Sequence, residues 1–470
     1  MTYDFVVIGG GSAGYAAAAT ACKLGLKVAV IEGGQDVGGL CILRGCMPSK
    51  TLLESANRFM TLRRAGEFGL RAENISFSGA EIIARKRRLI AEFADYRRQQ
   101  LETGAFDFIR GWASFVDART IKIDGAEPQT ISAQTVLLAT GSKLTHIDIP
   151  GCDDACFLDS DAVLESEHIP RSVLVLGAGP TGLEFAHFYA GLGCEVTVLQ
   201  RSGQVLKDMD GDVAAALSDA FQRRGVKMFL GTQLRRVEKT SSGKRVHFCH
   251  ESDEKFVEAE EIIYALGRSP QFEGLALEKA GLALQHGHLS VGATQQTKVE
   301  HVFAAGDAAG PYEIVHIAIQ QAELAARNAA KILHGGNEPL ETMDYRLKLS
   351  VVFTEPQVAA VGLTEKELIT ARGDYAVSTH PFNDHGKSMV LGETEGFVKL
   401  IARRPDGEIL GAAVVGPHAS DLIHEMSVAM HFHATVHDLL QAPHYHPTLS
   451  EIWTYPAEEI ALGDGRHGPK

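Results

Sequence analysis

The alternation of hydrophobic and polar positions predicts an α/β chain in which short buried strands are separated by helices. Uninterrupted apolar runs at residues 5–8 and 28–31 flank a helical segment, and the same order returns at residues 172–201. Apolar runs of this length, without alternation, are expected of parallel strands that are covered on both faces. Further buried strands that run into glycine turns are predicted at residues 135–142, 262–270 and 302–310.

The pattern changes at about residue 346, where stretches typical of antiparallel strands are followed by helices. A chain of 470 residues is also too long for a single hydrophobic core. We therefore predict an α/β fold with two Rossmann-like dinucleotide-binding domains and a C-terminal α+β domain.

The first predicted nucleotide site is the turn that carries Gly9, Gly11 and Gly14. In this spacing the first glycine permits a tight turn, the second lets a pyrophosphate approach the backbone, and the third lets helix and strand pack closely. The N-terminus of the following helix supplies backbone N–H groups to the phosphates. Glu32 ends the second strand, where a carboxylate can accept hydrogen bonds from ribose hydroxyls. This site therefore suits an unphosphorylated ribose, as in FAD.

A second turn with the same spacing predicts a second, different nucleotide. At the position that corresponds to Glu32 it carries Gln200, and two cations follow, Arg201 and Lys207. Cations attract a 2′-phosphate, which a carboxylate would repel, so this site leans toward NADP(H). Gln200 can also bond a plain ribose, which leaves NAD(H) open. The glycines of this turn are Gly177, Gly179 and Gly182.

Cys41 and Cys46 stand in the segment GGLCILRGCMPSK and allow three interpretations: a structural disulfide, half of a metal site, or a redox pair. A ring this small constrains the unfolded chain little, and the other cysteines form no obvious second pair for a metal. A helix predicted at residues 49–60, with Pro48 near its first turn, would stabilise a thiolate at its N-terminus and lower the thiol pKa. The pattern favours an exchangeable dithiol/disulfide.

Several motifs occur in an order that resembles one enzyme family. After the cysteine segment come ATGS, the second glycine turn, ALGR, AAGDAAG, FTEPQVAAVGLTE and HPTLSE. Together they resemble the class I flavoprotein disulfide reductases, also called pyridine nucleotide-disulfide oxidoreductases, over nearly the whole chain. The segments CMPSK and HPTLSE are more similar to those of dihydrolipoamide dehydrogenases and mercuric reductases than to those of glutathione reductases, and the chain as a whole most resembles the dihydrolipoamide dehydrogenase branch. The resemblance implies an FAD domain over residues 1–150, an inserted NAD(P) domain over residues 151–270, a central segment over residues 271–345 that returns to the FAD domain, and a C-terminal dimerisation domain over residues 346–470. It also implies an obligate homodimer.

The resemblance also implies roles for individual residues. Cys46 is expected to be the sulfur next to the flavin, and Cys41 the interchange thiol that meets the substrate. His446 matches the general acid/base, which comes from the other subunit, and Glu451 would orient it. Lys50 would lie near the flavin, paired with Glu184, and Asp307 would hold the ribityl chain. Further expected cofactor-binding positions are Gly39, Ala113, Thr140, Gly141 and Gly267.

The function that the resemblance implies is electron transfer between a dihydrolipoyl-type dithiol and NAD(P), through the cysteine pair and FAD. A lipoyl-carrying protein would then be a partner. The alternative is an NADPH-dependent reductase of a small disulfide, quinone or metal ion. Mercuric reductases typically end in a cysteine pair, whereas the last cysteine here is Cys249, which speaks against the metal substrate. A non-catalytic FAD-binding subunit is the third possibility, although it has no physical need for the cysteine pair and the His–Glu pair.

Charge and composition narrow the list of partners. The net charge of −14 argues against nucleic acid and anionic membranes as partners. No apolar run is long enough to span a bilayer, no signal peptide is recognised, and a cytoplasmic location is expected.

Three other features have no firm assignment. The polar segment 384–396 has no predicted role, and Cys152 and Cys156 are expected to be ordinary thiols. The histidines of a histidine-rich C-terminal region are expected to be interface and surface side chains. The alternative is that they form a metal-binding cluster. Its members are His424, His431, His433, His437, His444 and His446.

Overall fold

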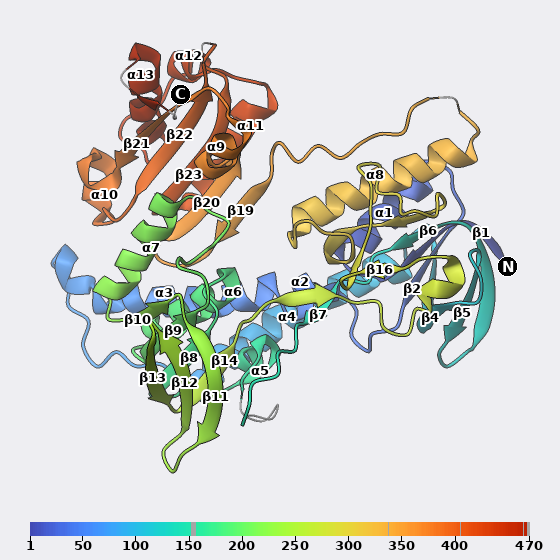
Figure 1. Ribbon diagram of the computed structural model, residues 1–470, viewed down its shortest axis with the longest axis horizontal. Helices are drawn as coiled ribbons and strands as arrows, with labels where there is room; N and C mark the ends of the chain where they lie inside the picture. The colour runs from blue at the N-terminus through green and yellow to red at the C-terminus, as the bar shows by residue number, and fades with distance from the viewer. Residues whose placement is uncertain (152–156, 337, 405, 464, 468–470) are drawn as a thin grey trace. The chain divides into compact units, whose positions relative to one another are not determined.

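The computed structural model describes residues 1–151, 157–336, 338–404, 406–463 and 465–467 (Figure 1). Cys152 and Cys156 lie outside the described residues. The chain divides into two compact units. The first contains Met1–Thr51, Ala84–His146 and Gly267–Asp344, and the second contains Leu52–Ile83, Ile147–Leu266 and Tyr345–Lys470. The predicted domain boundaries are a finer division than these units and stay a prediction.

A mixed sheet in the order β3-β2-β1-β6-β5-β4, with β18 also paired to β6, forms the centre of the first unit. Its pairings β1–β2, β2–β3, β1–β6 and β6–β18 are parallel, whereas β4, β5 and β6 pair antiparallel. The strands predicted at residues 5–8 and 28–31 therefore exist and are adjacent. The strands are β1 (Thr2–Ile8), β2 (Val28–Glu32), β3 (Asp107–Arg110), β4 (Trp112–Phe115), β5 (Thr120–Asp124), β6 (Gln129–Leu138) and β18 (Val302–Ala304).

Two alanine-rich helices, α1 (Ser12–Lys23) and α8 (Val315–Leu333), lie side by side in the first unit (Figure 1). Buried alanines such as Ala17 and Ala325 share one apolar cluster with Phe5 and Phe303 of the sheet. Small side chains let helices approach closely, so the two helices and the sheet form one tight layer pair. The remaining elements of this unit are α2 (Gly39–Leu43), β7 (Ser142–Leu144), β15 (Arg268–Pro270), η3 (Leu277–Ala280), β16 (Leu284–Gln285), β17 (His288–Leu289) and η4 (Gly306–Ala308).

Two helices contribute residues to both units: α3 (Cys46–Arg63) and α4 (Gly79–Glu102). The helix predicted at residues 49–60 is α3, and it begins three residues earlier than expected. Pro48 does not prevent this start, because the N–H groups of the first helical turn have no intrahelical acceptor and proline lacks only that group. Cys46 is therefore the first residue of a helix.

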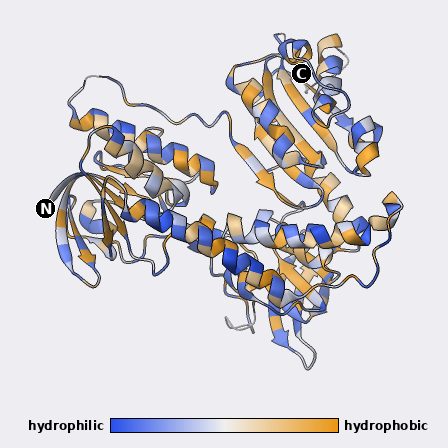
Figure 2. Cartoon of the chain, turned by 180° about the vertical axis from the view of Figure 1, so that it is seen from behind, coloured by the Kyte–Doolittle hydropathy of each residue, from blue (hydrophilic) through white to orange (hydrophobic). Residues whose placement is uncertain are grey.

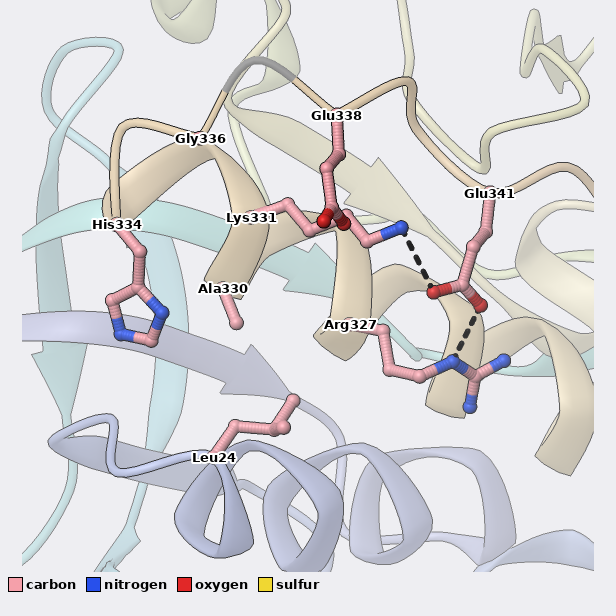
Figure 3. Close-up of a pocket in the computed structure, with 8 residues that line it drawn as sticks. All are labelled: Leu24, Arg327, Ala330, Lys331, His334, Gly336, Glu338 and Glu341. Carbon is pink, nitrogen blue, oxygen red and sulfur yellow. Dashed lines mark hydrogen bonds and ion pairs between the residues drawn. The ribbon is translucent and has the colours of Figure 1, made fainter.

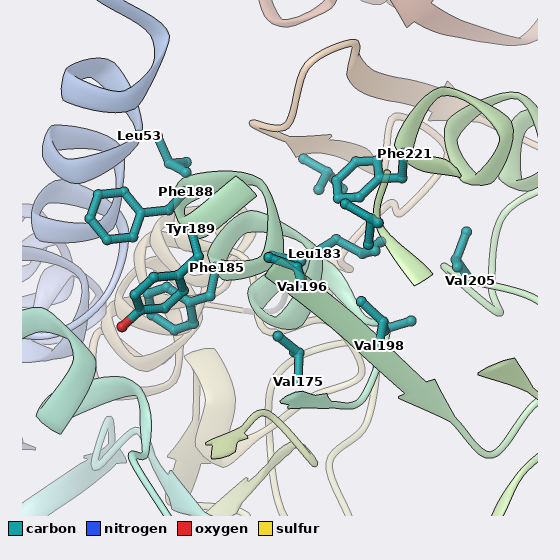
Figure 4. Close-up of a cluster of buried hydrophobic side chains, with 14 of the residues drawn as sticks. Leu53, Val175, Leu183, Phe185, Phe188, Tyr189, Val196, Val198, Val205 and Phe221 are labelled. Atoms are coloured by element: carbon teal, nitrogen blue, oxygen red, sulfur yellow. The ribbon is translucent and has the colours of Figure 1, made fainter. Parts of the chain in front are cut away.

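The second unit contains a parallel sheet in the order β10-β9-β8-β14. Helix α6 (Pro180–Gly191) follows β8 and is buried on nearly all sides, as expected for a helix without a polar face. Its Phe185, Phe188 and Tyr189 belong to the apolar cluster shown in Figure 4. The other elements are β8 (Ser172–Leu176), β9 (Glu195–Gln200), β10 (Lys227–Leu230), β14 (Glu261–Tyr264), α5 (Ser160–Glu165), α7 (Gly211–Arg223), η1 (Ala65–Phe68) and the antiparallel strands β11 (Gln233–Lys239), β12 (Lys244–His250) and β13 (Asp253–Ala259).

A six-stranded sheet in the order β19-β20-β23-β22-β21-β24 follows residue 346, and all its pairings are antiparallel. This confirms the predicted α+β character, and Figure 2 shows the largely hydrophobic strands. Its strands are β19 (Leu349–Val352), β20 (Gln357–Gly362), β21 (Tyr375–Pro381), β22 (Phe397–Arg403), β23 (Ile409–Gly416) and β24 (Arg466–His467). Its helices are α9 (Glu365–Ala371), η5 (Phe382–Asp384), α10 (Gly386–Leu391), α11 (Ala419–His431), α12 (Val436–Gln441), η6 (Ser450–Trp453) and α13 (Thr454–Leu462). None of the helices in the described part of the chain is both long and apolar enough to cross a membrane.

A buried lysine joins the start of α7 to the C-terminal sheet. Lys399 on β22 is 1% exposed, and its Nζ lies 2.9 Å from Asp210, 2.9 Å from Asp212 and 2.6 Å from Glu365. Burial by itself disfavours its charge, but the hydrogen bonds to Glu365, Asp210 and Asp212 outweigh burial and raise the pKa of Lys399. Asp210 also accepts the backbone N–H groups of Glu365 and Lys366. One ammonium group thus connects three elements of the second unit.

Replacing this lysine tests the contribution of the network. Lys399→Met should lower the free energy of unfolding by about 3 kcal/mol, because it leaves partly buried carboxylates without a counter-ion. The matched control is Lys122→Met, whose ion pair with Asp124 is half exposed and contributes less than about 1 kcal/mol. Urea unfolding of both variants measures the difference. Equal midpoints for the two variants would show that the buried network adds nothing to stability.

Candidate functional site

The first glycine turn connects β1 to α1 in a conformation that leaves no room for side chains. Gly9 has φ +112°, and a Cβ there would lie 2.3 Å from the Ala139 carbonyl oxygen. A Cβ on Gly14 would lie 1.8 Å from the Gly9 carbonyl oxygen. Gly11 faces Gly39 of α2 so closely that a Cβ on Gly39 would come within 2.6 Å of the Gly11 Cα. The turn therefore presents bare backbone at the N-terminus of α1.

The carboxylate of Glu32 is held at the end of β2 by this turn. Its Oε2 accepts the N–H of Gly10 at 2.8 Å, and its Oε1 accepts the N–H of Gly34 at 2.7 Å. A carboxylate has about four lone-pair sites, so two acceptor positions stay available for ribose hydroxyls. The position that the sequence predicts for a ribose-binding acid is thus occupied by a fixed carboxylate.

Asp307 on η4 is supported by two residues that the sequence analysis did not single out. Its Oδ2 accepts a hydrogen bond of 2.6 Å from the hydroxyl of Ser142. Arg268 donates from Nε to Ser142 Oγ at 2.9 Å and from Nη2 to the Ser142 carbonyl oxygen at 2.8 Å. Ser142 is the last residue of the ATGS motif, and Arg268 is the last residue of the ALGR motif. Their positions at the ends of these family motifs could have identified them as site residues.

The other cofactor-binding positions predicted for the first unit lie on several different elements. Thr140 and Gly141 follow β6, and the buried Thr140 hydroxyl has no hydrogen-bond partner within the described ranges. Gly267 has φ +108° and directly precedes β15. Ala113 lies in the middle of β4, and its side chain belongs to a buried apolar cluster. Only the backbone of Ala113 is therefore free for a cofactor contact.

The buried guanidinium group of Arg97 is a further polar group of the first unit that could contact a cofactor. Arg97 on α4 lies over the ring of Tyr15, 4.3 Å from its centroid. Its Nε and Nη1 are buried, and neither finds a hydrogen-bond partner in the part of the chain that the structure describes. Unpaired buried donors, the fixed carboxylate of Glu32 and the bare backbone of the turn fit a phosphate-bearing dinucleotide such as FAD. When bound there, FAD would supply a two-electron carrier.

The two cysteines meet between α2 and α3. Cys41 lies on α2, Cys46 is the first residue of α3, and both are reduced thiols that are not joined in a disulfide. A hydrogen bond with Cys46, followed by burial, raises the pKa of Cys41, which differs from the lowered thiol pKa that the helix end predicts. The physical reason is that the hydrogen bond with Cys46 and the burial of the sulfur both favour the neutral thiol of Cys41. The α3 dipole instead favours negative charge at the position of Cys46.

The second glycine turn, between β8 and α6, repeats the geometry of the first. A Cβ on Gly177 would lie 2.3 Å from the Ala265 carbonyl oxygen, and one on Gly182 would lie 2.1 Å from that of Gly177, whereas Gly179 has open space. Gln200 accepts the N–H of Ala178 at 3.0 Å, as Glu32 does at the first turn. The alignment of Gln200 with Glu32 in the sequence is thus reproduced in their hydrogen bonds.

The cations predicted to bind a 2′-phosphate follow β9. Gln200 donates from its amide nitrogen to Ser202, while Arg201 and Lys207 are exposed and make no ion pair with another described residue. Glu184 on α6 is buried and accepts the N–H of Phe353 at 3.1 Å. Lys50 belongs to the first unit and Glu184 to the second, so their pairing stays a prediction.

His446 and Glu451 form the close pair that the HPTLSE motif predicts. His446 Nδ1 lies 2.9 Å from Glu451 Oε2, with the histidine side chain 79% exposed and the glutamate 12% exposed. The buried carboxylate therefore fixes one ring nitrogen, and the other nitrogen faces solvent. An imidazole that is held by a carboxylate at one nitrogen and is accessible at the other can act as a general base.

Two of the other C-terminal histidines each pair with a different glutamate. His433 lies 2.7 Å from Glu408, and His444 lies 2.6 Å from Glu425. Among the residues that the structure describes, no three ligand side chains are grouped as a metal would require. A pocket elsewhere in the first unit, shown in Figure 3, contains none of the predicted site residues. It is lined by Leu24, Arg327, Ala330, Lys331, His334, Gly336, Glu338 and Glu341.

Comparison with known proteins agrees with this geometry. The chain is 34% identical to a dihydrolipoyl dehydrogenase of Chlamydia trachomatis, over 97% of this chain and 96% of that protein. It is 32% identical to a mercuric reductase of Bacillus cereus, over 92% of this chain and 67% of that protein. The crystal structure of LpdA from Mycobacterium tuberculosis matches with a TM-score of 0.87 and 30% identity, over 97% of this chain and 99% of that one.

Two family models match the chain in the predicted order. Residues 3–322 match the pyridine nucleotide-disulphide oxidoreductase model, and residues 349–457 match the dimerisation domain of that family, which supports a homodimer. The family implies FAD and a pyridine nucleotide as cofactors. The predicted fold class and family resemblance are confirmed. The chain belongs to the pyridine nucleotide-disulphide oxidoreductases and is a flavoprotein disulfide oxidoreductase.

Proposed function

We propose that the enzyme transfers electrons between a dihydrolipoyl-type dithiol and NAD(P) through Cys41, Cys46 and FAD. The observation that carries the proposal is the hydrogen-bonded contact of two reduced cysteines at the start of α3, in the unit whose polar groups fit FAD. Relatives named dihydrolipoyl dehydrogenase over nearly the full chain support the dithiol substrate. A lipoyl-carrying protein is the partner that this substrate implies.

The cysteine chemistry is a balanced thiol–disulfide exchange. A substrate thiolate attacks the sulfur of Cys41 in the Cys41–Cys46 disulfide, and Cys46 leaves as a thiolate. The second substrate thiolate then attacks the substrate sulfur of the mixed disulfide, which releases the cyclic disulfide and the Cys41 thiolate. Of the two substrate protons, one is transferred to a base and the other neutralises the Cys41 thiolate, while Cys46 stays a thiolate. FAD supplies the route by which the electron pair of the dithiol reaches the nicotinamide.

His446 is the proposed base for the substrate thiols. Glu451 binds its Nδ1–H and leaves Nε2 to take a proton, and the carboxylate then stabilises the imidazolium. In the homodimer, His446 of one subunit would serve the cysteine pair of the other. Lys50 and Glu184 are proposed to pair beside the flavin.

For the coenzyme, we propose a preference for NADP(H). Gln200 carries no charge to repel a 2′-phosphate, and the exposed cations Arg201 and Lys207 follow it in the chain. The same cations support the second candidate function, an NADPH-dependent reductase of a small disulfide, quinone or metal ion. The similarity to mercuric reductase over 92% of this chain is a further reason to test that function.

Initial rates decide between the two functions. The FAD-loaded enzyme should oxidise dihydrolipoamide with either coenzyme, faster with NADP⁺ than with NAD⁺, because the cations bind the extra phosphate. Absence of turnover, in a holoenzyme that NADPH still reduces, would reject the dihydrolipoyl proposal and favour the reductase.

The coenzyme site can be tested by reversing one charge. Arg201→Glu should lower kcat/KM for NADP⁺ relative to NAD⁺ by about tenfold or more, since a cation–phosphate contact becomes a repulsion. Lys227→Glu is the matched control, because it makes the same charge change at an exposed position on the neighbouring strand β10. Equal preference in the two variants would contradict the assignment of Arg201.

The base can be tested by removing its titratable group. His446→Gln should lower kcat for dihydrolipoamide by about a hundredfold or more, because the substrate thiol loses its proton acceptor. Reduction of the holoenzyme by NADPH requires no substrate thiol and should proceed as in the wild type. A normal dithiol turnover in His446→Gln would remove His446 from the reaction.

A further inference from the structure

A second imidazole lies behind Glu451, on the side away from His446. His385 belongs to the polar segment 384–396, which received no role from the sequence, and it immediately precedes α10. Its side chain is fully buried, with 0% exposure. Its Nε2 lies 3.5 Å from Glu451 Oε1, and its Nδ1 lies 2.8 Å from the hydroxyl of Ser388.

Glu451 thus lies between two histidines and offers one oxygen to each. Oε2 is 2.9 Å from His446 Nδ1, and Oε1 is the oxygen that His385 faces. The contact of 3.5 Å falls short of a full hydrogen bond, so the buried Nε2 has no satisfied hydrogen bond among the described residues, and Glu451 Oε1 is the carboxylate oxygen that it approaches. A buried ring nitrogen that points at a carboxylate oxygen and at nothing else identifies Glu451 as its partner.

The surroundings decide which ring nitrogen of His385 carries the proton. A proton on Nε2 can be donated to Glu451, and Nδ1 then accepts the hydroxyl proton of Ser388. The opposite tautomer would place the Nε2 lone pair against a carboxylate, which is repulsive. Only the first tautomer satisfies both contacts.

His385 is neutral in this environment. Burial lowers the pKa of His385, Glu451 opposes that effect, and the neighbouring His380 and His446 add to it. The ring of Tyr455 on α13 also faces it, edge-on at 6.2 Å. A neutral donor orients the carboxylate without cancelling its charge, so Glu451 keeps its charge for His446.

We propose that His385 is a positioning residue that holds Glu451, through its Nε2–H, in the orientation that fixes His446. The fully buried ring cannot touch substrate, so it acts only through Glu451. This inference rests on the proposed role of His446 as the base. By drawing electron density from the carboxylate, the Nε2–H of His385 also limits how strongly Glu451 can favour an imidazolium at His446.

The test compares two replacements of His385 in the FAD-loaded enzyme. His385→Phe keeps a ring of similar size without a donor, and it should lower kcat/KM for dihydrolipoamide about tenfold, the effect of losing one hydrogen bond to a charged group. The acidic midpoint of the pH profile should rise by about half a unit. His385→Gln provides an amide donor at a similar reach and should restore most of the activity and the midpoint.

A control separates this effect from loss of a buried histidine in general. His187 on α6 is also buried, with Nε2 2.7 Å from Asn57, and has no contact with Glu451. His187→Phe should leave the pH midpoint unchanged. NMR titration of ¹³C-labelled histidines, with the His446 signal assigned from His446→Gln, should show the same upward shift of the His446 pKa in His385→Phe without relying on turnover.

Failure of this inference can be told from failure of the proposed function. If His446→Gln lowers turnover while His385→Phe behaves like His187→Phe in rate, midpoint and NMR titration, the positioning role is wrong and the base is retained. If His446→Gln has no effect, the proposed function itself is wrong. If His385→Phe does not fold, Ser388→Ala can replace it, because it removes only the hydroxyl that contacts His385 Nδ1. Ser388→Ala should produce a smaller upward shift of the His446 pKa. An unchanged His446 pKa in this variant would overturn the proposal.

Discussion

The close approach of backbone to backbone at the first glycine turn is the constraint on which the nucleotide-binding part of the structure depends. The Gly9 carbonyl oxygen lies where a side chain on Gly14 would begin, so α1 can start directly against β1 only because that side chain is missing. The contact fixes the helix N-terminus and lets the N–H of Gly10 hold Glu32. The second unit repeats the arrangement between Gly177 and Gly182. One steric device therefore creates two sites, and a single acid-to-amide difference, Glu32 against Gln200, distinguishes their charge.

Buried charged groups in this protein have several polar or charged partners, whereas two exposed cations near the second glycine turn have no ion-pair partner among the described residues. Lys399 is buried with three carboxylates around it, and Glu451 is nearly buried between His385 and His446. In both places a charge that would be costly alone is stabilised by several partners. The cations assigned to the coenzyme, Arg201 and Lys207, are instead exposed and unpaired with any described residue, which leaves them able to bind an anion from solution.

The proposed redox pair, Cys41 and Cys46, shows how secondary structure can make two chemically identical residues unequal. Cys46 begins a helix, whereas Cys41 lies in the preceding short helix and is hydrogen-bonded to Cys46. Negative charge is favoured at the helix end and disfavoured at Cys41. A thiol pair with this asymmetry is suited to exchange, because one sulfur leaves readily while the other meets the substrate.

The sequence by itself determined the features that depend on neighbours along the chain: the two glycine turns, the buried parallel strands, the cysteine pair beside a helix and the His446–Glu451 pair. Each of these features depends on the spacing of residues that are close in the chain, and this spacing can be read directly from the sequence. Tertiary structure alone decided which residues support them. Arg268 reaches Ser142 across 126 positions of sequence, Lys399 meets Asp210 across 189, and His385 approaches Glu451 from a segment without a recognisable pattern. These contacts depend on how distant elements pack and on the directions in which their side chains then point. No periodic pattern in the sequence indicates them.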